Sequence, residues 1–150
     1  SQHPERIKHW ASKGNVESQY TLGEELGSGA FGVVRLATHN ETKTQWAVKC
    51  MSLEKLGGSS SEDEKALWNE VGLLLGLDHP NICRMTEFFV VGGDLFLVMD
   101  LLEGGELLDA LCDKGNYTES DARDVMRQLL SALAYLHSKG VVHRCVARIS

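Results

Sequence analysis

The glycine-rich segment Gly27-Ser28-Gly29-Ala30-Phe31-Gly32 has a residue pattern suited to binding phosphate. Its G-x-G-x-x-G spacing removes side chains where backbone N–H groups must approach phosphate oxygens. In dinucleotide-binding folds this motif opens a helix, and an acidic residue follows about 20 positions later. Here a strand pattern follows, and Lys49 stands at about that distance. By itself the motif fits a glycine-rich hairpin without a ligand equally well.

Lys49 and Glu70 are charged residues in predominantly apolar patterns. Lys49 ends an Ala-Val-Lys triplet within a predicted strand, and Glu70 falls along the apolar stripe of a predicted helix. A charge on a half-buried surface needs a partner. A lone strand lysine usually extends its ammonium group into water. We prefer an ion pair between Lys49 and Glu70, because it would satisfy both charges and hold the ammonium group against phosphate oxygens.

The elements that must position these residues are five short β segments with one helix among them. Alternating apolar residues and turn residues predict the strands. Ser61 and Glu64 form a capping-box pair that predicts the start of the helix. The strand segments are Tyr20 to Leu26, Val33 to Ala37, Trp46 to Met51, Met85 to Val91 and Leu95 to Asp100, and the apolar stripe of the helix comprises Leu67, Val71, Leu74 and Leu75.

Two further helices are predicted after these strands. A short one is expected near residues 106–112 and a long one near 119–139. Thr118 is the candidate N-cap of the long helix, and Gly140 ends it. Residues 1–19 are polar and weakly patterned, so we interpret them as a leader outside the core.

Composition excludes several classes of protein. The 150 residues carry a formal net charge of -6, which argues against binding to nucleic acid. No segment approaches the run of about 20 apolar residues that spans a bilayer, so no membrane association is expected. The cysteines Cys50, Cys83, Cys112 and Cys145 are dispersed, which is typical of unpaired thiols in a reducing compartment. We therefore expect the protein in the cytoplasm or the nucleus.

In order and spacing, these motifs resemble a protein kinase. The resemblance covers residues from about 20 to 144. It implies an α+β fold in which a small lobe, made of a five-stranded antiparallel sheet and one helix, joins a helical large lobe through a hinge. The expected division is a leader at 1–19, the small lobe at 20–98, the hinge at 99–105 and the incomplete start of the large lobe at 106–150. The matching segments are Gly27 to Val34, Ala47 to Lys49, Glu70, His79 to Ile82, Val98 to Asp100, Gly104 to Glu106 and His137 to Arg144.

The resemblance also implies an ATP site and the role of each residue in it. Lys49 and Glu70 correspond to the catalytic ion pair of the small lobe. Met99 would lie at the rear of the adenine pocket, and Glu106 would face the ribose. No metal ligand is expected, because the family's Mg²⁺ ligands are absent from this sequence. The full set of implied nucleotide-binding residues is Leu26, Gly27, Ser28, Gly29, Ala30, Phe31, Gly32, Val34, Ala47, Lys49, Met99, Asp100, Leu102 and Glu106.

Within the family, three segments resemble the calcium/calmodulin-type Ser/Thr kinases: Tyr20 to Gly27, Tyr117 to Ala122 and Leu133 to Ser138. Among these, the calcium-dependent kinases with a fused calmodulin-like region match best. The resemblance implies a protein substrate for the full-length parent. No calcium-binding loop is present in this sequence, so any calcium sensing would lie outside it.

The match breaks after His143-Arg144. The family's loop reads His-Arg-Asp-Leu-Lys-Pro-Glu-Asn, and in register Cys145 replaces the catalytic Asp, Ala147 the Lys and Ser150 the metal-binding Asn. No Asp-Phe-Gly follows. A thiol does not replace a carboxylate as a base opposite Mg²⁺. This chain alone is therefore expected to be inactive.

Two explanations of this break remain open. Agreement with the family's motifs is good through Arg144 and then ends at once, which favours read-through past an exon boundary, a frameshift or a truncated gene model. The alternative is a non-catalytic nucleotide-binding or interaction module, a pseudokinase-like isoform. An inert Cys145 is preferred to a nucleophilic one.

Overall fold

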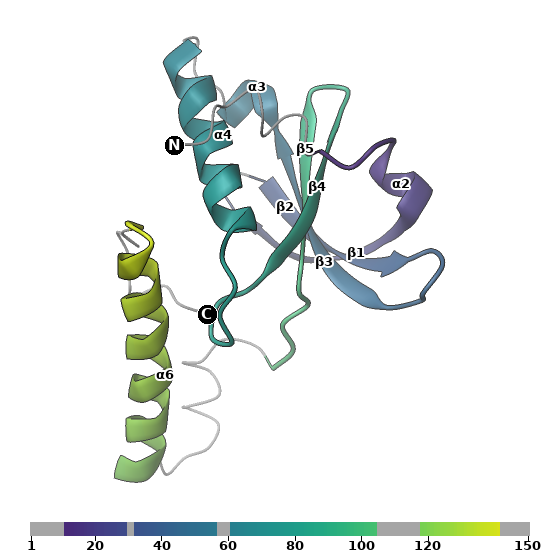
Figure 1. Ribbon diagram of the computed structural model, residues 1–150. Coiled ribbons are helices and arrows are strands. Elements are labelled where there is room, and N and C mark those ends of the chain that lie inside the picture. The colour runs from purple at the N-terminus through teal and green to yellow at the C-terminus, as the bar shows by residue number, and fades with distance from the viewer. Residues whose placement is uncertain (1–10, 30–31, 57–60, 105–117, 142–150) are drawn as a thin grey trace. The chain divides into compact units, whose positions relative to one another are not determined.

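The computed structural model describes residues 11–29, 32–56, 61–104 and 118–141 (Figure 1). The chain divides into two compact units, and each is described by itself below. The first unit comprises residues 1–77 and 84–101, and the second comprises residues 78–83 and 102–150. Several predictions lie outside the described residues: those for Ala30, Phe31, the helix near 106–112, Glu106 and the segment from His143 to Ser150.

The first unit contains the predicted five-stranded antiparallel sheet, with strand order β1-β2-β3-β5-β4. The predicted fold class is therefore confirmed. The strands are β1 (Tyr20–Gly29), β2 (Gly32–His39), β3 (Gln45–Ser52), β4 (Met85–Val91) and β5 (Asp94–Met99). The described residues of this unit form three helices, α2 (Val16–Gln19), α3 (Leu53–Leu56) and α4 (Ser61–Leu75).

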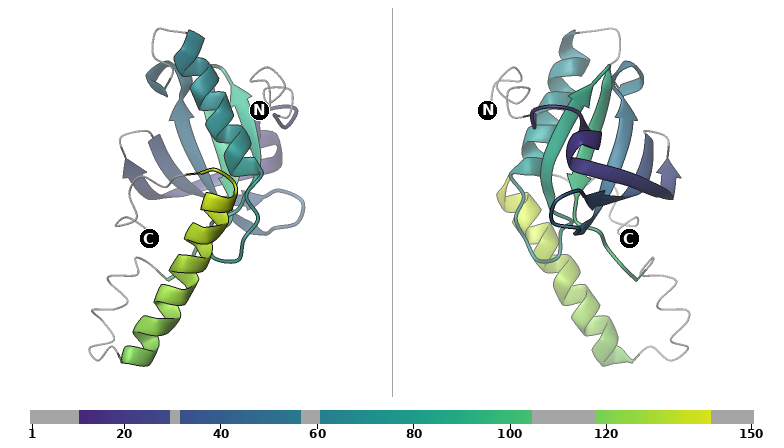
Figure 2. Two further views of the ribbon diagram at one scale, coloured as in Figure 1. Left: turned by 60° about the vertical axis from the view of Figure 1, so that its left-hand side comes forward. Right: turned by 90° about the vertical axis from the view of Figure 1, so that its right-hand side faces the viewer.

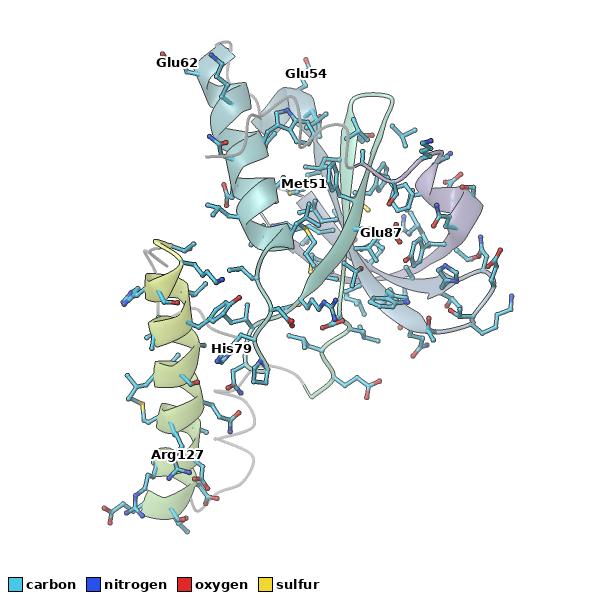
Figure 3. All side chains as sticks on the ribbon, viewed as in Figure 1. Met51, Glu54, Glu62, His79, Glu87 and Arg127 are labelled. Atoms are coloured by element: carbon cyan, nitrogen blue, oxygen red, sulfur yellow. The ribbon has the colours of Figure 1, made fainter. Side chains whose placement is uncertain are left out.

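The sheet has an apolar core on each of its faces, because alternate residues of a strand point to opposite sides. Figure 2 shows α4 on one side of the sheet and α2 on the other. In Figure 3, Met51 lies on the side of α4 and Glu87 on the side of α2. The core on the α4 side consists of Met51, Trp68, Val71, Met85, Phe88, Leu95 and Leu97. The core on the α2 side consists of Val16, Tyr20, Ala37, Val48, Phe89 and Val98.

Three of the four residues of the predicted α4 stripe, Leu67, Val71 and Leu75, pack on the core of the sheet, but the stripe missed the residue at its centre. Trp68 is almost fully buried in the core, with Val71 beside it. Leu74 is exposed, and so is Glu70, which was expected to lie along the buried stripe. The large indole ring of Trp68 fills the space between helix and sheet, and Glu70 lies on the exposed side of α4. The prediction of a buried Glu70 is therefore wrong.

The leader, residues 1–19, was expected to lie outside the core. Its described part, from Ala11 onward, instead packs against the sheet. Val16 is 1 % exposed and belongs to the core on the α2 side of the sheet. Asn15 caps α2 by accepting a hydrogen bond from the N–H of Glu17, 3.3 Å away. The backbone N–H of Ser12 donates to the carbonyl oxygen of Phe88 in β4 at 2.8 Å. From Ala11 onward, the leader is therefore part of the folded first unit.

The second unit contains α6 (Glu119–Ser138), close to the predicted range. Thr118 and Asp121 form a capping box at its start, as the choice of Thr118 as N-cap predicted. Gly140 has a φ of 73°, a conformation that suits a glycine at a helix end. Within the described ranges, no helix is long and apolar enough to cross a membrane.

Candidate functional site

The glycine-rich segment forms the hairpin between β1 and β2. Gly27 pairs with Val34, Ser28 with Val33 and Gly29 with Gly32. A side chain built at Gly27 or Gly29 would meet nothing within 4 Å. Packing therefore does not require glycine at either position. Their lack of side chains instead leaves the backbone of the hairpin open to close approach by a ligand, as a phosphate-binding loop requires.

Gly32 has a different role from Gly27 and Gly29. Its φ is 151°, and a Cβ atom there would lie 2.1 Å from the carbonyl oxygen of Cys50 and 2.9 Å from Cγ of Met51. Glycine at this position therefore lets the hairpin pack closely against β3. The motif thus combines two kinds of glycine. Gly27 and Gly29 have free space where a side chain would project, and Gly32 allows the close packing that fixes the hairpin against β3, the strand that carries Lys49.

Lys49 lies in a row of paired residues across the sheet. Val34 of β2 pairs with Lys49, and Lys49 pairs with Leu97 of β5. Directly paired residues point to the same side of a sheet, and Leu97 belongs to the core on the α4 side. The partly buried Lys49 side chain therefore leaves the sheet on the α4 side, in the same row as Val34.

The neighbouring row consists of apolar residues. Leu36 pairs with Ala47, and Ala47 pairs with Met99. Ala47 is buried and Met99 packs against the core on the α4 side. The two rows thus place Val34, Ala47 and Met99, all three predicted nucleotide-binding residues, on the same side of the sheet as Lys49. This surface suits a flat apolar ring with an anionic group beside it.

The structure does not bring every predicted site residue to this surface. Both Lys49 and Glu70 are described, and no ion pair joins them; Glu70 is exposed on α4. Leu26 lies at the irregularity in the register of β1 between Glu25 and Gly27, and it is 47 % exposed. At the hinge, the N–H of Asp100 donates to the carbonyl oxygen of Arg84 at 3.0 Å. Leu102 belongs to the second unit and is exposed.

In the second unit, the His79-Pro80-Asn81 turn is held against α6, which the sequence motifs did not predict. The hydroxyl oxygen of Tyr135 accepts a hydrogen bond from the backbone N–H of Asp78 at 3.0 Å, and its ring lies 5.2 Å from the ring of His79. His79 Nε2 is 3.0 Å from Oγ of Ser131, and Asn81 donates to Gln128 at 3.0 Å. The helical spacing of Gln128, Ser131 and Tyr135 was the only signal of a shared polar face.

Tyr135→Phe is expected to loosen the turn from α6 without unfolding the helix. The substitution keeps the ring and removes the acceptor for the N–H of Asp78, at a cost of about 1 kcal/mol. Amide exchange at Asp78 should accelerate about fivefold in hydrogen-exchange measurements on the whole chain, whereas Ser120→Ala on the exposed first turn of α6 should leave it unchanged. Unchanged exchange at Asp78 in Tyr135→Phe would show that the other contacts of the turn with α6 hold it without the Tyr135 hydroxyl.

The five-stranded antiparallel sheet with α4 packed on one face, the glycine hairpin between β1 and β2 and the lysine of β3 have the arrangement of a kinase small lobe. The family profile described as protein kinase domain matches residues 20–146. The chain belongs to the protein kinase family. One relative, 39% identical over 131 residues that are 87% of this chain and 18% of the relative, is named probable serine/threonine-protein kinase fhkE of Dictyostelium discoideum, in agreement with the Ser/Thr type that the resemblance implied.

Two further relatives illustrate the similarity. Myosin light chain kinase A of Dictyostelium discoideum is 42% identical over 129 residues, which are 86% of this chain and 43% of the relative. Calcium/calmodulin-dependent protein kinase type 1 of Macrobrachium nipponense is 42% identical over 130 residues, which are 86% of this chain and 36% of the relative. The chain thus spans less than half the length of these relatives. These names confirm the predicted similarity to calcium/calmodulin-type kinases, and a fused calmodulin-like region stays a prediction.

A solved structure gives the same assignment. The crystal structure of Rad53 1-466 in complex with AMP-PNP superposes with a TM-score of 0.75 and 31% sequence identity. The match covers 88% of this chain and 34% of that chain. The chain is therefore similar to the N-terminal part of a kinase domain in both sequence and fold.

Proposed function

We propose that this chain is the ATP-binding portion of a Ser/Thr protein kinase. The observation that carries the proposal is the row Val34–Lys49–Leu97, which presents one cation on the apolar surface next to the open glycine hairpin. The Rad53 structure similar to this chain is a complex with AMP-PNP, which supports a nucleotide ligand.

The residues present fit such a ligand. The Gly27 and Gly29 backbone is free of neighbouring atoms where a side chain would project, so N–H groups there can donate to phosphate oxygens. The ammonium group of Lys49 would offset phosphate charge, and Val34 and Ala47 would cover the adenine ring. Bound ATP would supply the phosphoryl group, and Mg²⁺ held by residues of the full-length parent would offset the phosphate charge.

We also propose that this chain binds nucleotide without transferring phosphate. Cys145 occupies the position of the family's catalytic Asp, and Ser150 that of its metal-binding Asn. A thiol is a poor general base for a protein hydroxyl opposite Mg²⁺, which prefers hard oxygen ligands. In the full-length parent we expect a protein substrate, regulation by a calcium sensor outside this sequence, and a cytoplasmic or nuclear location.

Lys49→Met is expected to weaken ATP binding at least tenfold, because a charge-assisted contact to phosphate is lost while the length of the side chain is kept. The affinity is measured by titrating the whole chain with a fluorescent ATP analogue, with and without Mg²⁺. Lys65→Met, on the exposed face of α4, is the matched control and should bind like the unmodified chain. Glu70→Gln should also leave affinity unchanged, since Glu70 is not paired with Lys49.

Two outcomes would contradict the proposal. Equal affinities of Lys49→Met and Lys65→Met would remove Lys49 from the site. Phosphate transfer to a serine peptide by the unmodified chain, lost in Lys49→Met, would show that Cys145 does not prevent catalysis.

A further inference from the structure

Glu87 of β4 accepts hydrogen bonds from both ends of the segment formed by residues 12–20. The hydroxyl of Tyr20 donates to one carboxylate oxygen at 2.5 Å, and the hydroxyl of Ser12 donates to the other. The N–H of Ser12 also donates to the carbonyl oxygen of Phe88. Glu87 lies on the α2 side of the sheet (Figure 3). We call residues 12–20 the strap. Both its end residues, Ser12 and Tyr20, are hydrogen-bonded to Glu87.

The strap covers the core on the α2 side. Val16 and Tyr20 are buried there, and the Tyr20 ring makes edge contacts with Phe89 at 6.1 Å and with His39 at 5.0 Å. The side-chain amide of Asn40 donates to the carbonyl oxygens of Glu17 and Ser18, both at 3.2 Å. The C-terminal half of the strap is therefore held by many contacts, whereas Ser12 is held mainly through Glu87 and one backbone bond.

Both Glu87 contacts depend on hydroxyl protons. Burial raises the pKa of the Tyr20 phenol well above its ordinary value, and the hydrogen bond to Glu87 and its charge raise it further. Tyr20 therefore stays a donor at every physiological pH. The Ser12 hydroxyl does not ionise, and it can lose its donor capacity through covalent modification.

We propose that the strap is releasable and that Ser12 is the position at which phosphorylation opens it. A Ser/Thr protein kinase would transfer the γ-phosphoryl group of ATP to Oγ of Ser12, forming an O–P bond as the bond to ADP breaks and the hydroxyl proton leaves to the base. The product removes the donor to Glu87 and places a charge of about -1.5 to -2 against that carboxylate. Like charges in contact on a partly buried surface repel each other.

The position of Ser12 suits this modification. Ser12 is partly exposed and lies outside any helix or strand, and the next three residues are exposed. Gly14, with a φ of 98°, lies between Ser12 and α2. The peptide around Ser12 can therefore leave the sheet while α2 and Tyr20 stay bound. Release would uncover the Phe88 carbonyl at one edge of β4 and loosen the lead-in to β1, the strand that carries the glycine hairpin.

The experiment is hydrogen exchange on the whole chain with phosphoserine incorporated at position 12. Exchange at the Ser12 amide should accelerate at least tenfold, because a hydrogen bond to a charged acceptor is replaced by repulsion. Ser12→Ala should have a smaller effect, since it removes the donor without adding charge. Phosphoserine at position 120 in α6 is the control and should change nothing in the strap.

A second comparison isolates Glu87. In the Glu87→Gln background the acceleration caused by phosphoserine should shrink severalfold, because the neutral amide no longer repels the phosphate. Unchanged Ser12 exchange in the phosphorylated chain would overturn the proposal. The same acceleration in both backgrounds would also overturn it, because the release would then not depend on Glu87.

Discussion

Gly32→Ala is expected to destabilise the first unit by about 2 kcal/mol or more and to weaken nucleotide binding. The new Cβ atom would lie 2.1 Å from the carbonyl oxygen of Cys50, a backbone atom that cannot rotate away. The backbone at Gly32 also has a φ of 151°, which a side chain strains. Overpacking and backbone strain each cost about 1–3 kcal/mol. The hairpin must therefore move away from β3, taking the phosphate-facing glycines with it.

Gly29→Ala is the matched control, because its Cβ atom would meet nothing within 4 Å. It lies in the same hairpin and pairs directly with Gly32. Urea unfolding of the two variants gives the difference in stability, and titration with a fluorescent ATP analogue gives the difference in affinity. Equal loss of stability in both variants would mean that glycine flexibility, rather than close packing on Cys50, is required at Gly32. If Gly29→Ala lowers the affinity without lowering the stability, the backbone at Gly29 contacts the nucleotide directly.

The sheet could be predicted from the sequence because its signals are local. The run of β-forming residues from Met85 to Val91, followed by the Gly92-Gly93-Asp94 turn, predicted the bounds of β4, and both glycines have positive φ in that turn. The apolar residues around Lys49 likewise placed it in a strand. Its neighbours in the sheet, Val34 and Leu97, depend on the register of β2 and β5 and became known only from the structure.

The central position of Trp68 on the inward face of α4 could not be predicted in the same way. Periodicity indicates that a helix has an apolar face, but the packing partners decide which residue lies at its centre. Trp68, whose ring lies 6.0 Å from that of Phe88, occupies that position here. The predicted stripe omitted Trp68 and therefore placed Glu70 on the wrong side. The Lys49–Glu70 pair depended on that placement.

The strap was missed for a different physical reason. Val16 is the only strongly apolar residue in α2, so no periodic pattern marks this segment. Its binding depends on hydrogen bonds from Ser12 and Tyr20 to a carboxylate 67 or more residues away. Such pairs have no local signature. Polar contacts of this kind become visible only when the strands are arranged in space.

Phe88→Ala is expected to cost about 4 kcal/mol, the largest loss of stability predicted for this chain. Phe88 is 0 % exposed and packs between the sheet and Trp68 of α4. It also pairs with Leu97, which pairs with Lys49, so all three side chains lie in one row. A cavity at Phe88 would therefore weaken the attachment of α4 and the support of Lys49 together. Small domains are stable by about 5–15 kcal/mol, so this change removes a large part of the total.

Val90→Ala, two residues along the same strand, separates the effect of burial from that of strand propensity. Val90 is 39 % exposed, and its truncation should cost about 1 kcal/mol or less. Thermal and urea unfolding of the two variants measure the difference. A loss in Phe88→Ala no greater than that in Val90→Ala would contradict the assignment of Phe88 to the core between α4 and the sheet. If Phe88→Ala instead unfolds, Phe88→Leu keeps most of the volume, and its smaller loss should be accompanied by faster amide exchange in α4, because α4 is the element that the Phe88 ring holds against the sheet.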